Sequence, residues 1–237
     1  MMIPSLLIAF TSLLTTAPPP TADEIVGRMM EREARRPIPA HTSIRQYHLD
    51  NKRYHKTADM KVRVTVAANG IKSYEVLEEL GSSSLRKLVF HKMLKAECES
   101  SRPDLREANR ITPANYHFEL SGTEPIEGRP AYILAVKPRG KNKFLILGRV
   151  WIDAEDYAIV KVEGNPVENP SFWTRGVHFS QTYKQHGDFW LPATNRLVTE
   201  ARFFGPTDLA VEYGSYSLPA DRTVNVTEIP VRRAWEH

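Results

Sequence analysis

Apolar and polar residues alternate with a period of two along much of this chain, most clearly around the charged turn Asp153–Asp156. Before that turn, Val150 and Ile152 share one face of the run, and after it Val160 and Val162 share one face of the next. Period two on both arms of a short polar turn is typical of a β-hairpin that is buried on one side. The stretch therefore predicts two paired strands whose apolar side chains face another part of the protein.

The same alternation recurs in eight further runs, so the sequence predicts ten strands. Their expected ranges are 43–51, 59–68, 71–79, 116–122, 131–137, 144–153, 158–164, 174–183, 189–200 and 209–217. Asn69-Gly70, between the second and third, is a strong signal for a two-residue hairpin turn. The parity of the 144–153 strand places Trp151 on its polar face with Arg149. Because the turns are short and no repeat of about 40 residues occurs, one antiparallel meander is expected.

Two segments change to helical spacing. In residues 21–36, Thr21 is the expected N-cap, and acidic residues follow it in the first turn. In residues 82–100, behind a serine cap, apolar side chains recur every three to four positions, as Leu85, Leu88, Val89 and Met93. Residues 102–116 are expected to form an irregular connection with room for a short helical turn. The second helix thus interrupts the strand series between the third and fourth strands.

A long sheet that is apolar on one face only must cover that face or close on itself. We therefore expect a mainly β protein with a single curved antiparallel sheet and helices on its concave face. Leu85, Leu88, Val89 and Met93 would then face an elongated apolar space as its lid. Its expected lining residues are Val62, Val64, Val66, Tyr74, Val76, Tyr116, Phe118, Leu120, Tyr132, Leu134, Val136, Val150, Ile152, Val160, Val162, Phe179, Val211 and Tyr213. A tightly packed core without a cavity fits the same pattern.

The start of the chain is typical of an export signal. Ile3–Leu14 is an uncharged, mostly apolar run that is too short to span a bilayer. Cleavage is expected between Ala17 and Ala22, and an uncleaved single anchor is the alternative. The expected organisation is a signal peptide at 1–22, one domain at 23–217, and a tail or edge strand at 218–237. A periplasmic location follows from this interpretation.

Composition and motifs narrow the function. Charged residues make up 25% and apolar residues 41% of the chain, which favours a globular domain. The formal net charge is +4 with basic and acidic residues interleaved, so nucleic-acid binding is not expected. Cys98 is the only cysteine, and Asp153, Glu155 and Asp156 lack the glycine and distal glutamate of a calcium loop. These acidic residues are expected to be turn formers and solubility charges. No hydrolase, zinc, phosphate-loop or dinucleotide motif occurs, so we expect no catalytic site, no metal and no cofactor.

Two neighbouring hairpins carry a family resemblance. The first, Gly122–Gly140, runs strand, turn and strand, with Gly128-Arg129 in the turn and Lys137-Pro138 at its end. The second is Gly148–Gly164. Together with the opening helix and the helix after three strands, they resemble the outer-membrane lipoprotein-sorting protein family, the LolA/LolB/RseB-like superfamily. The resemblance covers roughly residues 22–217.

The resemblance implies an unclosed β-barrel with helices plugging its concave side. It implies a periplasmic, monomeric, non-enzymatic protein that carries or sorts lipids or lipoproteins by holding their acyl chains in a hydrophobic cavity. Inner- or outer-membrane proteins are the expected partners. In the family's carrier an arginine on an early strand holds the closed lid; Arg45 and Arg63 both lie on early strands, and no local motif chooses between them. The alternative is an RseB-like sensor or regulatory partner that binds lipid-linked signals or other proteins. An enzyme or structural domain of unknown kind is the third alternative.

Overall fold

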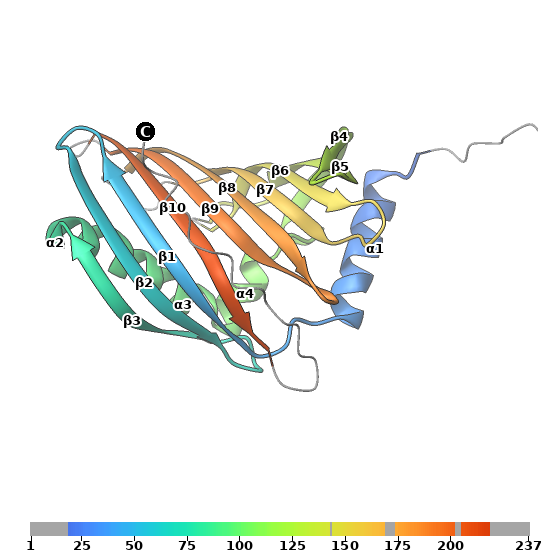
Figure 1. Ribbon diagram of the computed structural model, residues 1–237. Coiled ribbons are helices and arrows are strands. Elements are labelled where there is room, and N and C mark those ends of the chain that lie inside the picture. The colour runs from blue at the N-terminus through green and yellow to red at the C-terminus, as the bar shows by residue number, and fades with distance from the viewer. Residues whose placement is uncertain (1–18, 143, 169–173, 202–204, 219–237) are drawn as a thin grey trace, which may run out of the picture.

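The computed structural model describes residues 19–142, 144–168, 174–201 and 205–218 of the chain. The expected signal peptide lies outside this part up to residue 18, and the expected tail lies outside it from residue 219. The described residues form one ten-stranded antiparallel sheet with helices on one side of it (Figure 1). None of the helices among them is long and apolar enough to cross a membrane.

Each of the ten predicted strands corresponds to one strand of the structure. Their bounds are β1 His41–Asn51, β2 Lys56–Val66, β3 Lys72–Gly81, β4 Tyr116–Ile126, β5 Arg129–Pro138, β6 Ile146–Asp153, β7 Ile159–Pro166, β8 Thr174–His186, β9 Phe189–Ala201 and β10 Gly205–Ser217. The alternation of apolar and polar residues was therefore a sound guide to the strands, because most of them are buried on one face only.

The order of strands in the sheet is β3-β2-β1-β10-β9-β8-β7-β6-β5-β4. β1 and β10, the first and last strands among the described residues, pair inside the sheet, and β3 and β4 form its two edges. Among the described residues these edges are not paired with each other, which confirms the predicted unclosed barrel. The segment 82–115 links one edge to the other and must therefore cross the whole concave side.

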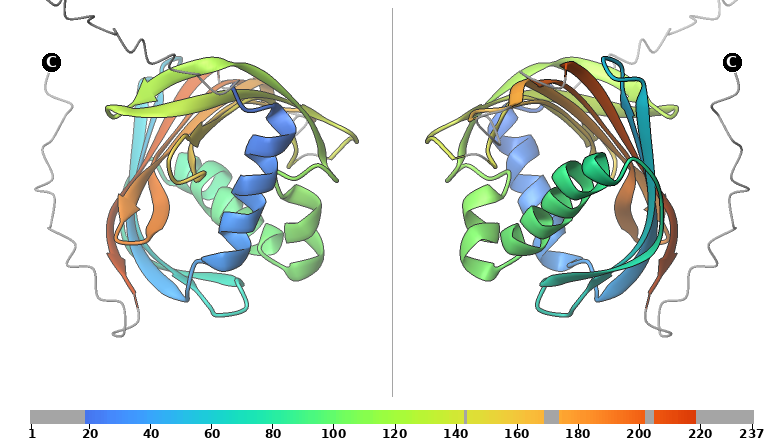
Figure 2. Two further views of the ribbon diagram at one scale, coloured as in Figure 1. Left: turned by 90° about the vertical axis from the view of Figure 1, so that its right-hand side faces the viewer. Right: turned by 90° about the vertical axis from the view of Figure 1, so that its left-hand side faces the viewer.

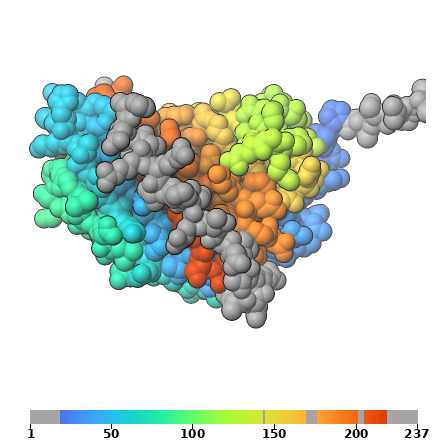
Figure 3. Space-filling view, in the orientation of Figure 1, coloured from blue at the N-terminus to red at the C-terminus, as the bar shows by residue number. Residues whose placement is uncertain are grey.

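This crossing segment supplies most of the helical cover. It contains α2 (Ser83–Leu85), a π-helical turn η1 (Arg86–Phe90), α3 (His91–Ser100) and α4 (Pro103–Asn109), which is the short helix expected in the connection. Seen end on, the sheet curls around these helices, which lie within its curve (Figure 2). The space-filling view shows the opposite, outer side of the sheet, where strands rather than helices form the surface (Figure 3).

The helix α1 (Ala22–Arg35) covers the other half of the concave face. It begins where the sequence predicts, because the Thr21 Oγ1 accepts a hydrogen bond from the Glu24 N–H at 3.3 Å. The Glu24 carboxylate in turn accepts from the Thr21 N–H at 2.7 Å, which completes a capping box. Its buried residues Ile25, Val26 and Met29 pack against side chains of β4, β5, β6 and β7.

The β2–β3 hairpin differs from the predicted two-residue turn. The Ala67 N–H donates to the Ile71 carbonyl at 2.9 Å, so three residues lie in the loop. Gly70 is the last of them and has a φ of 80°, a left-handed conformation that glycine adopts at little cost. The Asn-Gly signal therefore located the turn correctly but not its length.

Two predictions about the β6–β7 hairpin are wrong, and a β-bulge explains the first. The register shifts between Trp151 and Ile152, which leaves Val160 as an extra residue on β7. As a result, Val160 does not share a face with Val162. It packs with Trp151 in a separate cluster on the outer side of the sheet.

The second error concerns burial on that outer side. Trp151 has the predicted parity, but it is only 2% exposed. The Lys161 Nζ lies 4.3 Å from its ring centroid, the Arg149 guanidinium lies 5.2 Å away, and the indole N–H donates to Glu124. Apolar neighbours and long charged side chains with apolar stems thus bury an aromatic ring on a face that the sequence pattern marks as polar.

Asp153 is not the solubility charge that the sequence suggests. It is 1% exposed and accepts hydrogen bonds from Arg129 at 2.6 and 2.8 Å and from the Asp156 N–H at 2.7 Å. Burial alone would raise the pKa of Asp153, but these hydrogen bonds outweigh it and lower that pKa. The residue therefore closes the β6–β7 turn as a buried, ionised acceptor.

A glycine pair in the same hairpin gives a test of the fold. Gly148 lies opposite Gly164, and a Cβ on Gly148 would lie 2.0 Å from the Glu163 carbonyl oxygen. We expect Gly148→Ala to lower the free energy of unfolding by about 2–4 kcal/mol, because the backbone must shift to admit the methyl group. In α1, where a Cβ on Gly27 would meet nothing within 4 Å, Gly27→Ala should instead raise it by about 0.5–1 kcal/mol. Urea denaturation measures both, and a Gly148→Ala protein as stable as the wild type would contradict the pairing.

Candidate functional site

The concave face brings together most of the residues predicted to line an apolar space. Beneath α1, one cluster contains Tyr116, Leu134, Val136, Val150, Ile152 and Val162, with Phe118, Leu120, Tyr132 and Phe179 packed against it. Beneath the α2–α3 segment, a second cluster contains Val62, Val64 and Val211, with Val76 and Tyr213 packed against it. Each half of the concave face thus has its own helical cover, and both halves belong to one continuous sheet.

Three of the predicted lining residues differ from this group. Val160 lies on the outer side, as described above. Tyr74 pairs with Val64 and so points to the concave face, but it is 36% exposed because its strand β3 is an edge. Val66 is the last residue of β2 and is half-buried. The two residues on the concave side therefore lie at its margin.

The prediction that Leu85, Leu88, Val89 and Met93 all face the concave side is partly wrong, because the segment Ser83–Ser100 is not uniformly α-helical. Leu85 is buried, and Val89 and Met93 pack against the same cluster, but Leu88 is 44% exposed. The π-helical turn at Arg86–Phe90 adds a residue to one turn and rotates the following side chains around the axis. The buried residues after Leu85 are consequently Phe90 and Leu94.

The prediction also missed apolar residues on β1. Tyr47 and Leu49 are buried in the second cluster, and the Tyr47 ring contacts the Phe90 ring edge-on with centroids 5.7 Å apart. Their signal was present in the sequence, since both alternate with the polar residues His48 and Asp50. Only the pairing of β1 with β10 reveals that this strand lies inside the sheet, with a neighbour on each side.

A buried ionic contact joins α3 to the concave face. Arg45 of β1 is 4% exposed, and its Nη1 lies 3.0 and 2.9 Å from the two carboxylate oxygens of Glu97 on α3. The Lys72 Nζ of the edge strand donates to the same carboxylate at 2.8 Å. The Arg45 Nε donates to Ser43 at 3.2 Å, and its guanidinium lies 4.6 Å from the Tyr213 ring centroid. We call Arg45, Lys72 and Glu97 the clasp.

The clasp is ionised, although burial opposes charge. Desolvation alone would raise the pKa of Glu97, but the charges of Lys72 and Arg45 outweigh it and lower that pKa from 4.5 to about 2. Burial likewise opposes the charge of Arg45, yet the neighbouring Glu97 raises its pKa. Burial raises the pKa of Tyr213 to about 12. The clasp is therefore a fixed group of three charges at ordinary pH, set within an otherwise apolar surface.

Of the two early-strand arginines, only Arg45 contacts the helical lid. Arg63 lies on the outer face of β2 and pairs with Glu75 of β3, where both side chains are exposed. A second ionic contact holds the other end of the lid. Glu79 of β3 accepts from Arg86 at 2.7 Å and lies 2.6 Å from the His91 ring. Polar anchors therefore fix the lid at both ends, with the apolar contacts between them.

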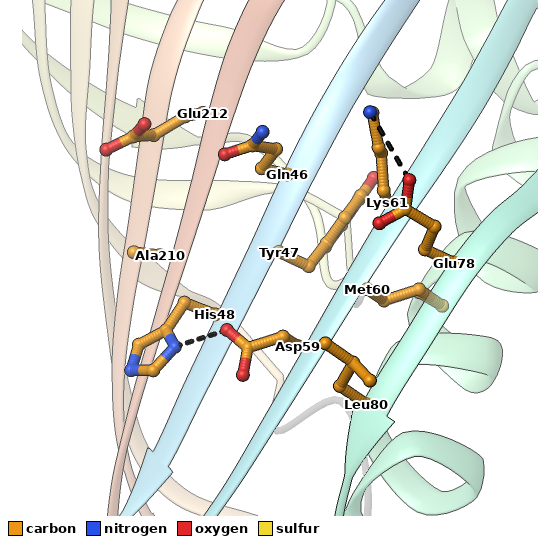
Figure 4. A pocket seen from close by; sticks show the side chains of 10 residues that line it. All are labelled: Gln46, Tyr47, His48, Asp59, Met60, Lys61, Glu78, Leu80, Ala210 and Glu212. Atoms are coloured by element: carbon orange, nitrogen blue, oxygen red, sulfur yellow. Dashed lines mark hydrogen bonds and ion pairs between the residues drawn. The ribbon is translucent and has the colours of Figure 1, made fainter. Parts of the chain in front are cut away.

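The outer face carries a shallow hollow of about 180 Å³ over β1, β2, β3 and β10. His48 and Asp59 lie 2.7 Å apart in it, Lys61 and Glu78 lie 3.5 Å apart, and the exposed Leu80 borders them (Figure 4). The imidazole and the ammonium group of these two pairs thus each have a carboxylate partner within the hollow. The hollow therefore lies on the side of the sheet away from the apolar clusters and does not extend them.

Neither a metal site nor an activated thiol emerges from the described residues. Within them, no three His, Cys, Asp or Glu side chains gather closely enough to hold a metal ion. Cys98 is a half-buried free cysteine beside Glu97, and burial together with that carboxylate raises its pKa. A raised pKa disfavours the reactive thiolate, so this thiol is a poor nucleophile.

No family model and no curated protein matches the chain. Among solved structures, a DUF1329 family protein from Desulfovibrio piger is 10% identical, with 84% of this chain and 94% of that chain covered and a TM-score of 0.47. A domain assigned to the outer membrane lipoprotein-sorting proteins, from Vibrio parahaemolyticus, is 15% identical with the same coverage and a TM-score of 0.45. A LolA superfamily protein from Nitrosomonas europaea is 11% identical, again with 84% and 94% covered, and has a TM-score of 0.38. The last two carry names of the superfamily that the sequence resembles. With TM-scores below 0.5, these likenesses say nothing about what this chain binds.

Proposed function

We propose that this chain binds acyl chains of lipids or lipoproteins between its concave face and its helices, and carries them through the periplasm. The observation that supports this most strongly is that, in the part of the chain that the structure describes, helices provide most of the cover of the apolar concave face. A helix can leave such a face without breaking any strand pairing, since its contacts with the sheet are side-chain contacts. Displacing it exposes a long apolar wall of the kind that an acyl chain needs.

Simple energetics support the exchange of a helix for a lipid chain. Each buried methylene contributes about 0.8 kcal/mol, so a long acyl chain can replace much of the apolar contact that a displaced helix loses. The two clusters lie side by side on one sheet, beneath α1 and beneath the α2–α3 segment. Movement of either helix would thus open one half of the face while the other half keeps the domain folded.

The clasp favours a lid with a defined closed position. A buried ion pair adds little net stability compared with apolar packing, but it fixes the position of the elements that it joins. Arg45 and Glu97 make that contact between β1, an interior strand of the sheet, and α3. The resemblance of the hairpin sequences to the lipoprotein-sorting family supports the same function.

An acyl-chain binding experiment tests this proposal. The fully buried Leu134 belongs to the cluster beneath α1, and Leu134→Gln should weaken binding of a fluorescent long-chain fatty acid by about tenfold or more, because it interrupts the apolar wall. Val150→Thr, which conserves volume, should weaken it less and stay folded. Leu80→Gln on the outer face, where Leu80 is 65% exposed, is the matched control and should bind like the wild type.

The rate of probe exchange tests the lid separately. Phe90→Ala removes a fully buried contact of the crossing segment and should speed both uptake and release, whereas Leu88→Ala, at an exposed position, should change neither. A well-folded wild-type protein that takes up no acyl probe at micromolar concentration would refute the carrier proposal. A stoichiometric protein partner recovered without lipid would instead favour the sensor or regulatory alternative.

A further inference from the structure

A hollow of about 580 Å³ lies beside α1, between the helix and the β6–β7 turn. It adjoins the apolar cluster beneath α1 through Tyr157 and is lined mainly by charged side chains. Its lining residues are Arg28, Glu31, Arg32, Arg35, Arg36, Glu155, Asp156 and Tyr157. Four of these eight are arginines: Arg28, Arg32 and Arg35 lie in α1, and Arg36 is its C-cap.

The acidic residues of this hollow already have partners. Glu155 lies 3.1 Å from a guanidinium nitrogen of Arg129, which is not part of the lining. Asp156 accepts a hydrogen bond from the Trp190 indole N–H at 2.9 Å and lies 3.9 Å from the same guanidinium. The carboxylates of the β6–β7 turn are therefore committed to other groups.

The arginines, in contrast, are short of anionic partners. Arg35 lies 3.7 Å from Glu31, and both side chains are largely exposed. Across the part of the chain that the structure describes, no carboxylate lies within ion-pair distance of Arg28, Arg32 or Arg36. With Arg129 and its partner Asp153 included, five guanidinium groups meet four carboxylates in this region.

Arg28 and Arg32 are held in place by neutral groups. The Arg28 Nη1 donates to the Tyr157 hydroxyl at 3.0 Å, and its guanidinium lies 5.1 Å from that ring centroid. The Arg32 Nη2 donates to the Asp188 carbonyl at 3.3 Å, while its Nε is buried without an acceptor. A buried charged donor without an acceptor is costly, and an anion in the hollow would satisfy it.

We propose that this hollow binds a phosphate ester. Guanidinium groups recognise phosphate oxygens through paired N–H donors, and several of them on one helix suit a doubly charged, three-oxygen ligand better than a single carboxylate. The C-terminal dipole of α1 accounts for cations in the last turn and opposes an anion there, but Arg28 stands two turns from the end of the helix. The excess of guanidinium groups outweighs this dipole.

The place of the hollow agrees with a phosphorylated amphiphile as well as with a soluble phosphate ester. At about 100° per residue, Arg28 and Arg32 lie along one edge of the stripe of Ile25, Val26 and Met29 that faces the apolar cluster. A phosphate bound there would lie at the margin of the concave face. Phosphate binding does not require acyl-chain binding, so this proposal and the proposed function can fail separately.

Calorimetric titration with glycerol 3-phosphate in phosphate-free buffer tests the site. The wild type should bind it saturably, more weakly as salt is added, and Arg28→Gln and Arg36→Gln should each weaken binding by about tenfold. Arg36→Gln changes an exposed side chain at the end of α1 and so keeps the test valid if Arg28→Gln folds poorly. Arg63→Gln removes the same charge from the outer face and should bind like the wild type.

Vesicles separate the two sources of phosphate. Binding to phosphatidylcholine vesicles that contain phosphatidic acid, lost in the same arginine variants and absent with phosphatidylcholine alone, would identify a lipid headgroup. Binding of glycerol 3-phosphate without vesicle binding would identify a soluble ester. No saturable binding in either arm, or an equal loss in Arg63→Gln, would overturn the proposal.

Discussion

Arg45→Met is expected to lower the free energy of unfolding by about 3–5 kcal/mol, because it leaves the Glu97 carboxylate partly buried with one cationic partner fewer. The Arg45 side chain is 5% exposed and that of Glu97 is 26% exposed, so water can replace little of the lost interaction. Lys72 still contacts Glu97 at 2.8 Å, which should hold the loss toward the lower end of this range. Urea denaturation measures the change.

Two control variants distinguish the clasp from a general effect of removing arginine. The double variant Arg45→Met with Glu97→Gln should recover much of the loss, because no uncompensated carboxylate remains in the interior. Arg63→Met, which breaks an exposed pair with Glu75, should cost at most about 1 kcal/mol. Equal losses for Arg45→Met and Arg63→Met would show that the clasp is not buried in solution.

The ionised Glu97 of the clasp also makes the stability of the fold depend on pH in the acidic range. Since the pKa of Glu97 is lowered from 4.5 to about 2 in the folded protein, its stabilisation is complete above pH 4.5 and is lost as the pH falls toward 2. A difference of this size corresponds to about 3 kcal/mol. Wild-type stability should therefore drop across this interval more steeply than that of the double variant.

The strands could be predicted because one-sided burial leaves a period of two in the sequence, and the start of α1 because Thr21 and Glu24 form a capping box at the expected place. The assignment of alternate residues to the two faces of a strand is wrong beyond any point where a bulge adds a residue to the strand. The bulge on β7 turns Val160 outward, and nothing in the local sequence marks it. The π-helical turn does the same to the lid, where it exposes Leu88 and buries Phe90 and Leu94.

The charged part of the site could not be predicted, because its partners are far apart along the chain. Arg45 and Glu97 are separated by 52 positions and meet only because the crossing segment returns over β1. An alternation of apolar and polar residues also does not show which face of a strand is exposed to solvent. Trp151 is buried on the polar face by apolar neighbours such as Val160 and by the stems of its charged neighbours. The sequence thus indicates an apolar face covered by helices, and only the structure shows that the Arg45–Glu97 ion pair joins α3 to that face.

Ile152→Asp is expected to lower the free energy of unfolding by about 3–5 kcal/mol, because the new carboxylate would be buried in the cluster beneath α1 without a partner. Leu147→Asp on the same strand is the matched control. Leu147 is 57% exposed where Ile152 is fully buried, so the same kind of change should cost within about 0.5 kcal/mol there. Lys161→Asp is not a neutral surface control, because the Lys161 Nζ lies over the Trp151 ring and 2.8 Å from Glu163. Similar losses for Ile152→Asp and Leu147→Asp in urea melts would show that β6 presents its other face to the interior, and the concave apolar wall that acyl-chain binding requires would then not exist in this form.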